Sequence, residues 1–269
     1  MRRITLSFVL VVVALTFGFA EGRIKEKNIL KEKEYLQYKV SYAFLRVGTL
    51  KVFNYGKETV DGYHGYHVKI FIDSNPKIPF VKVHDIYETV MNENFEPIYF
   101  IAWEQKDDHL LKTTYEFNYS PDSSHIRAKE IKIVEEEQRE VLQTDSIIPI
   151  DTVYRDAISL LFYARHFADV KSEKTYVPII ALLKKENCYF DNSGVVKEIK
   201  FNDSKIDTYY LDGKLKFIGI VGIKDDFKGW FSSDEQRVPV VARMKAFFGS
   251  IKIELEEYQN WEGPLRASN

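Results

Sequence analysis

The last third of the chain contains a long run in which every second residue is apolar, and this pattern constrains the fold more than any other feature of the sequence. From residue 238 to residue 248 every second side chain is apolar: Val238, Val240, Ala242, Met244, Ala246 and Phe248. The other face of this segment includes Arg243 and Lys245. A period of two is typical of a strand with one buried face, and a slip of one residue would turn the whole apolar set outward. A second alternating run, residues 250–258, follows Gly249, so we predict two neighbouring strands.

The same period begins at Tyr35 and recurs along most of the chain. Turn residues separate the runs, and the dipeptides Asp61-Gly62 and Asp212-Gly213 predict tight hairpins. The further predicted strands are 35–44, 49–55, 67–73, 81–91, 97–104, 109–119, 125–134, 176–183, 187–190, 195–201, 206–211, 214–220 and 227–232. We therefore expect a mainly β protein with a single domain over residues 35–260, arranged as a long antiparallel meander. Long strands in sequential hairpins favour a strongly curved sheet, a half-barrel or an open barrel.

One segment departs from this period. Between Asp151 and Ala168 the apolar residues are spaced three or four apart, which predicts a helix over residues 152–168. Asp151 or Thr152 can cap its first turn by accepting backbone N–H bonds. We expect the helix to pack across the sheet and to cover part of its apolar face, because a sheet with one apolar face needs a second layer.

The two ends of the chain differ in composition from the predicted domain. Residues 1–20 combine Arg2 and Arg3 with a long apolar run and small residues at the end, which predicts a signal peptide. The alternative is a membrane anchor, but the apolar run is shorter than the ~20 residues that a spanning helix needs. Residues 21–34 are rich in charge and are interpreted as a solvated lead-in, and residues 261–269 as a tail. We expect an exported protein, periplasmic or secreted, with no stable transmembrane anchor after cleavage.

Charge and cysteine content exclude some classes of function. The 38 Lys and Arg residues nearly balance the 40 Asp and Glu residues, so the chain lacks the basic excess typical of nucleic-acid binding, and we expect no nucleic-acid partner. A single cysteine, Cys188, cannot form an internal disulfide. Because it lies in a predicted strand, we interpret Cys188 as a buried, unreactive thiol rather than as a nucleophile.

The segment around the alternating strand also carries a family resemblance. Residues 228–234, with the sequence KGWFSSD, are followed by Arg237 and Pro239 and then by Gly249-Ser250-Ile251. This arrangement resembles the exported bacterial proteins grouped as domain of unknown function 3108, over about residues 36–258. The resemblance implies an exported, mainly antiparallel β protein, a half-barrel akin to envelope lipoprotein carriers. It implies no established activity and no catalytic residues.

Three residues of this segment are the candidate binding residues: Trp230, Asp234 and Arg237. Residues 232–237 are predicted to form a polar hairpin loop in which Asp234 and Arg237 are close enough to form an ion pair. One interpretation is turn architecture alone. The other is a site at the mouth of the barrel, with Asp234 and Arg237 meeting a polar head group and Trp230 packing against the apolar part of a ligand.

The sequence gives only weak indications of metal binding or catalysis. His64 and His67 are three residues apart, but the chain has no zincin spacing and no cysteine cluster, so we predict no metal and no cofactor. The sequence lacks a Gly-x-Ser-x-Gly elbow, and we assign no catalytic residue. Many aromatic residues crowd the N-terminal strands, which predicts either a large filled core or an apolar concavity that holds a ligand.

The hypothesis favoured by these observations is a non-enzymatic protein of the cell envelope that binds a lipid- or glycan-type ligand or an envelope partner. One alternative is an envelope hydrolase with a carboxylate and histidine site built around Asp225, Asp226 and Asp234. Another is a structural component of an envelope assembly that docks through a sheet edge.

Overall fold

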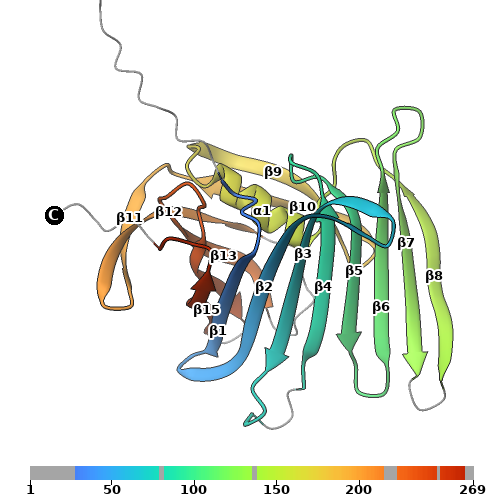
Figure 1. Ribbon diagram of the computed structural model, residues 1–269, viewed down its shortest axis with the longest axis horizontal. Coiled ribbons are helices and arrows are strands. Elements are labelled where there is room, and N and C mark those ends of the chain that lie inside the picture. Colours follow the sequence, from blue (N-terminus) through green and yellow to red (C-terminus); the bar gives the residue numbers. More distant parts are fainter. Residues whose placement is uncertain (1–27, 79–81, 135–137, 215–222, 247–248, 264–269) are drawn as a thin grey trace, which may run out of the picture.

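A computed structural model describes residues 28–78, 82–134, 138–214, 223–246 and 249–263. In this part of the chain, fifteen strands form one antiparallel sheet with a single helix, α1, against it (Figure 1). The mainly β, single-sheet architecture predicted from the alternation is confirmed. The predicted signal peptide, residues 1–20, lies outside the described residues. No helix in the described ranges is long and apolar enough to cross a membrane.

The first half of the sheet is a meander whose strands pair in sequence order. Its strands are β1 (Glu34–Tyr42), β2 (Leu45–Val60), β3 (Tyr63–Ser74), β4 (His84–Met91), β5 (Pro97–Gln105), β6 (Leu110–Asn118), β7 (His125–Val134) and β8 (Arg139–Pro149). Asp61 and Gly62 join β2 to β3 with positive φ angles of 51° and 88°, so the tight turn predicted from this dipeptide is confirmed.

The second half extends the same sheet from the other side of β1. Its strands are β9 (Ser172–Ala181), β10 (Lys184–Asn192), β11 (Val196–Phe201), β12 (Ser204–Lys214), β13 (Ile223–Ser232), β14 (Pro239–Ala246) and β15 (Ser250–Gln259). The order continues from β1 through β15, β14, β13, β12 and β10 to β9, while β11 pairs with β12. Tyr35 pairs with Gln259, so the two ends of the domain meet in the middle of the sheet. β8 and β9 are its edges, and the sheet is curved but not closed (Figure 1).

The helix α1 (Ala157–Phe167) begins later than the sequence predicted. Its N-cap is Asp156, whose Oδ1 accepts hydrogen bonds from the backbone N–H groups of Ile158 (2.7 Å) and Ser159 (3.0 Å). The predicted start near residue 152 was wrong because the chain first forms a parallel bridge between Arg155 and Ile179 of β9. That bridge holds residue 155 in extended backbone, so the helix cannot begin before it.

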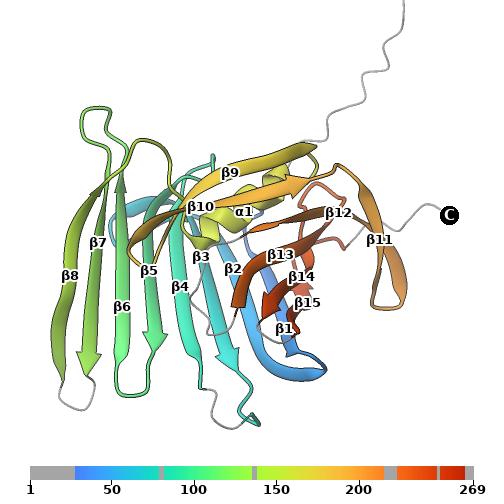
Figure 2. The same ribbon diagram turned by 180° about the vertical axis from the view of Figure 1, so that it is seen from behind.

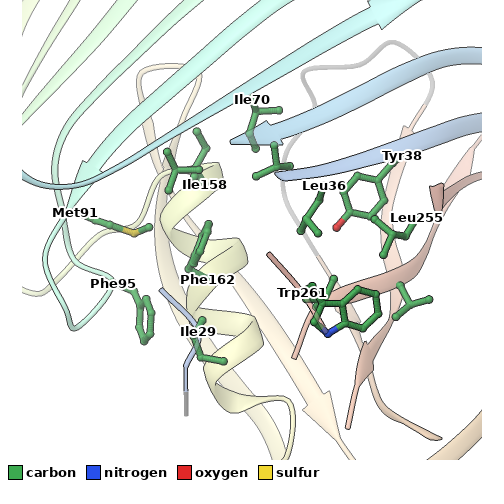
Figure 3. Packing of buried hydrophobic residues seen from close by; sticks show 14 of the residues in the cluster. Ile29, Leu36, Tyr38, Ile70, Met91, Phe95, Ile158, Phe162, Leu255 and Trp261 are labelled. Carbon is green, nitrogen blue, oxygen red and sulfur yellow. The ribbon is translucent and has the colours of Figure 1, made fainter. Parts of the chain in front are cut away.

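The core lies between the concave face of the sheet and α1. Figure 2 shows α1, β9 and β10 crossing in front of the first half of the sheet. Ile158 and Phe162 of α1 belong to one buried cluster with Ile70 and Met91 of the sheet (Figure 3). A further buried cluster contains Phe100, Ala102, Tyr115, Phe117, Ile126, Ala128, Ile150 and Ile180. In these clusters the aromatic residues of the N-terminal strands form a filled core rather than the walls of an apolar cavity.

The boundaries predicted at the two ends of the domain are corrected by burial. Ile29 and Glu34 are 2% and 1% exposed, so this part of the charged lead-in is not solvated. Trp261 is 5% exposed and packs against Tyr258 and Phe201 at centroid distances of 4.8 and 6.2 Å. The tail assigned to residues 261–269 therefore begins inside the core (Figure 3).

Two strand predictions also needed correction. β8 was not predicted, because its residues are mostly exposed and lack the apolar alternation of the other strands. Asp212-Gly213 is not a hairpin turn but lies within β12. Gly213 has a different role there, since a Cβ at this position would collide with the carbonyl oxygen of Tyr189 on β10. The residues predicted to follow that turn, 215–220, lie outside the described part of the chain.

Candidate functional site

The predicted binding residue Asp234 lies in the loop between β13 and β14, where it is engaged by the protein itself. Its Oδ1 accepts hydrogen bonds from the backbone N–H groups of Gln236 (2.9 Å) and Arg237 (3.1 Å). Its Oδ2 accepts a hydrogen bond from Trp261 Nε1 at 2.9 Å. Asp234 therefore shapes the loop and fastens the C-terminal end of the domain, which supports the turn interpretation.

Arg237 lies in the same loop, but the predicted ion pair with Asp234 was wrong. Arg237 Nη2 pairs with Asp169 Oδ2 at 2.6 Å, and its guanidinium lies over the ring of Tyr209. Arg237 has a φ of 46°, and its backbone N–H donates to Asp234 Oδ1. The side chain is 8% exposed, and its Nε and Nη1 are buried without a hydrogen-bond partner.

Trp230 does not join these two residues. It lies on β13 opposite Val241, next to Tyr210 (5.2 Å between ring centroids) and Arg243 (5.7 Å from the ring centroid). The neighbouring Phe231 packs into the core under α1. Because successive residues of a strand point to opposite faces, Trp230 lies on the outer face of the sheet. The three predicted residues thus divide between one loop and the opposite face of a strand.

The loop that holds Asp234 and Arg237 rests on a buried ion pair. Arg165 of α1 donates from Nη1 and Nη2 to the two carboxylate oxygens of Glu34, at 2.7 and 2.8 Å. Arg165 also donates to the carbonyl oxygen of Gln236, and both charged side chains are 1% exposed or less. This bidentate pair joins β1, the helix and the loop, so its role is structural.

The residues of the alternative hydrolase site do not form a cluster. Asp226 lies early in β13, where it forms ion pairs with Lys245 and Lys214, whereas Asp234 follows the end of that strand. The side chain of Asp225 is outside the description. Cys188 is buried, and burial raises the pKa of its thiol to about 12, as expected for an unreactive cysteine.

The histidine pair predicted as a weak metal candidate also separates. His67 is held between Glu58 (2.5 Å) and Glu88 (2.8 Å), whereas His64 contacts the hydroxyl of Thr59. Burial alone would lower the pKa of His67, but its hydrogen bonds to Glu88 and Glu58 raise it. Among the described residues, no group of three or more His, Cys, Asp or Glu side chains could hold a metal ion.

A different place on the molecule has the form of a binding groove. The tip of the β2–β3 hairpin bends across β4 and β5 on the outer face of the sheet (Figure 1), after a bulge at Gly56, where φ is 89°. Tyr63 at this tip stacks on Tyr99 with ring centroids 4.5 Å apart. Between the tip and β6–β8 lies a groove of about 640 Å³. Its lining residues are Tyr63, Glu116, Phe117, Asn118, Tyr119, His125, Arg127, Asp145 and Ile147.

The groove combines aromatic rings with fixed charges. Arg127 Nε and Nη2 donate to the two carboxylate oxygens of Asp145, both at 3.0 Å, and this pair lowers the pKa of Asp145. Burial, followed by the charge of Glu116, raises the pKa of the Tyr63 hydroxyl, so Tyr63 stays neutral and can donate a hydrogen bond. The ring of Tyr63 beside planar polar groups can hold a ligand that has both apolar and hydroxylated surfaces.

Sequence reasoning missed this groove. Tyr63 comes from the β2–β3 hairpin, whereas Arg127 and Asp145 lie on the paired strands β7 and β8, and the approach of Tyr63 to them depends on the bend of the β2–β3 hairpin. The available signal was Asp61-Gly62, which placed Tyr63 beside a turn, and the alternation that placed Glu116 and Arg127 on the outer faces of neighbouring strands.

These features define the chain as an open-barrel-like antiparallel β protein with an internal helix and an outer groove. The family of proteins of unknown function DUF3108 matches residues 37–256, and the chain belongs to this family. Among solved structures, one similar protein is a beta-barrel-like protein of domain of unknown function DUF1849 from Brucella abortus. Its TM-score is 0.52 with 6% sequence identity over 87% of this chain and 99% of that chain, which is a likeness of fold alone. No curated protein matches the sequence.

Proposed function

We propose that this protein is exported and acts in the cell envelope as a non-enzymatic binding protein whose ligand is a glycan. The groove between the β2–β3 hairpin tip and β6–β8 carries this proposal. A sugar ring has an apolar face of C–H groups and an edge of hydroxyl groups. The ring of Tyr63 can pack against the apolar face of the sugar. The carboxylates of Glu116 and Asp145 can accept hydrogen bonds from its hydroxyl groups, and the amide of Asn118 can accept or donate them.

A glycan fits the described residues better than a lipid does. An acyl chain needs a continuous apolar channel, but the clusters between the sheet and α1 are filled by Phe162, Phe100, Tyr115 and their neighbours. The second groove, of about 470 Å³, is lined mainly by polar residues that include Arg46, Lys51 and Asp73. The polar character of both grooves supports a hydroxylated ligand.

Export is supported by the N-terminal sequence. Residues 4–17 are almost wholly apolar, follow Arg2 and Arg3, and precede small residues at 18 and 20. We expect cell fractionation with an antibody to place the protein outside the cytoplasm, at the mass of a chain that lacks about twenty residues. A full-length protein in the cytoplasmic fraction would contradict this part of the proposal.

Binding is tested with the purified chain and an array of envelope-type oligosaccharides, followed by calorimetry on those retained. Tyr63→Ala removes the aromatic support of the groove, and we expect the dissociation constant to rise about 5- to 30-fold, or ~1–2 kcal/mol. Tyr176→Ala is the matched control, because Tyr176 is an exposed tyrosine on β9, outside the lining of the groove. Absence of binding to every glycan, or equal binding by both variants, would overturn the proposal.

A further inference from the structure

His67 is a buried imidazole with a carboxylate at each ring nitrogen. It lies on β3 and is 7% exposed, and because the next residue, Val68, belongs to the core, His67 faces the outer side of the sheet. Its Nδ1 lies 2.5 Å from Glu58 Oε1, and its Nε2 lies 2.8 Å from Glu88 Oε2. A neutral imidazole has only one N–H group, and an ionised carboxylate can only accept. The ring can therefore donate to both carboxylates only when it is protonated.

The charges around the ring balance in the protonated form. Glu58 faces the ring from β2 and Glu88 faces it from β4, while Lys69 of β3 pairs with Glu88 at 2.8 Å. Tyr55 of β2 covers one face of the ring, with ring centroids 4.9 Å apart. Two carboxylates thus meet two cations, whereas a neutral ring would leave one carboxylate uncompensated. Although burial lowers the pKa of His67, the hydrogen bonds to Glu88 and Glu58 raise it above its ordinary value.

The ring connects the overhanging end of the β2–β3 hairpin to the sheet. The pairs between β3 and β4 begin at Tyr66, whereas β2 and β3 stay paired as far as Val60 and Tyr63. Residues 57–65 therefore form the tip of the hairpin. Glu58 belongs to this tip and Glu88 belongs to β4, so the protonated ring joins the tip to the neighbouring strand.

The position of the tip determines the shape of the groove. Tyr63 in the tip lines the groove and stacks on Tyr99 of β5. Val60 also packs against the outer cluster that contains Tyr99. These apolar contacts fix the far end of the tip. Its base follows the bulge at Gly56, where the hairpin bends, and there the contact of Glu58 with the ring closes the bend.

We propose that His67 is a positioning residue of the groove: its protonated ring holds the tip against the outer face and so sets where Tyr63 lies relative to β6–β8. The folded ring keeps its proton to a higher pH than a free imidazole does. The tip is therefore held below that pH and loosens as the pH rises through it. This role goes beyond the proposed function, because it concerns the shape of the groove; only its effect on affinity rests on glycan binding.

Amide hydrogen exchange of residues 57–65 in the purified chain, at about pH 6 and about pH 9, tests the role of His67. After correction for the intrinsic exchange rate at each pH, we expect protection of the tip in the native chain to fall at least about tenfold at the higher pH. His67→Gln, which cannot titrate, should give the low protection at both values. His64→Gln is the matched control, because His64 lies in the same tip and contacts only the Thr59 hydroxyl among the printed side chains, at 3.1 Å. It should keep the response of the native chain.

A second variant decides the question if circular dichroism shows that His67→Gln does not fold. Glu58→Gln removes the carboxylate on the tip, whose side chain is 45% exposed. We expect it to lower the pKa of His67, followed by nuclear magnetic resonance of the ring, and to lower protection of the tip at about pH 6. An unchanged pKa together with unchanged protection would overturn the role of His67.

The remaining outcomes separate this role from the proposed function. Equal protection of the native tip at both pH values, or a response that persists in His67→Gln or disappears in His64→Gln, would overturn the positioning role and leave glycan binding untouched. A tip that responds as expected in a chain that binds no glycan would refute the proposed function alone. Where a glycan does bind, its affinity for the native chain should fall at the higher pH, and its affinity for His67→Gln should not change with pH.

Discussion

At the scale of single residues, the buried ion pair between Glu34 and Arg165 matters more for stability than an exposed ion pair of the same geometry. Both side chains are excluded from water, and their two hydrogen bonds connect the first strand to the helix. An ion pair in this position is costly to form, yet breaking it is costlier, since the remaining charge stays buried without compensation. The same geometry at the surface, between Arg46 and Glu256 at 2.9 Å, stabilises far less because water screens it.

We predict that Glu34→Gln lowers the free energy of unfolding by about 3–5 kcal/mol. Glu256→Gln, which breaks the exposed bidentate pair, should cost about 0–1 kcal/mol. Urea denaturation followed by circular dichroism measures both values. An equal loss of unfolding free energy from the two substitutions would show that burial does not make the ion pair more important for stability.

At the scale of elements, α1 depends on its first turn. Asp156 is buried and accepts backbone hydrogen bonds from Ile158 and Ser159 while Thr89 of β4 donates to it. The cap therefore also fastens the helix to the sheet. Asp151, one of the two residues predicted from the sequence to cap the helix, is exposed and lies ahead of the bridge at Arg155.

Asp156→Ala is predicted to destabilise the protein by about 1–2 kcal/mol, because it removes the cap and leaves backbone N–H groups buried. Asp151→Ala should change stability by less than about 0.5 kcal/mol, since it alters an exposed side chain outside the helix. Thermal unfolding of the two variants under one set of conditions compares them. A larger loss of stability from Asp151→Ala than from Asp156→Ala would instead support a helix that begins near residue 152.

At the scale of the whole molecule, the two halves of the sheet meet where β1 pairs with β15. The C-terminal end is held there by Trp261, which packs against Tyr258 and Phe201 and donates to Asp234. A continuous sheet with shared clusters should unfold as one cooperative unit, since neither half buries its apolar face alone.

Trp261→Ala should lower the free energy of unfolding by about 3–5 kcal/mol through loss of a buried aromatic side chain. Trp230→Ala, on the outer face, is the control and should cost less. Unfolding monitored by fluorescence and by circular dichroism should give coincident single transitions for the native chain. Two separated transitions would show that the halves fold independently.

Alternation predicted most of the strands, because it follows from burial of one face and is a local property, but it missed the mostly exposed strand β8. Val238 and Val240 are fully buried and Arg243 and Lys245 exposed, as the period of two requires. The helix start was missed because Arg155 forms a bridge to a distant strand, and no local pattern encodes that bridge.

The candidate site was harder to predict because it depends on tertiary geometry. Charge near the N-terminus indicated solvent exposure for Glu34, whereas a single arginine on α1 draws it into the core. Asp234 and Arg237 were correctly placed in one loop, yet Arg237 forms its ion pair with Asp169 rather than with Asp234. Which of several charges pair is decided by packing, and sequence alone does not contain that packing.

The pairing of β1 with β15 also governs when the protein can fold. Tyr35 leaves the ribosome long before Gln259, so β1 has one unsatisfied edge until β15 has been synthesised. Contacts between such distant parts of a chain slow folding, because a large loop must close before they form. For a protein proposed to be exported, this delay is useful, because the native sheet cannot be completed before β15 has emerged.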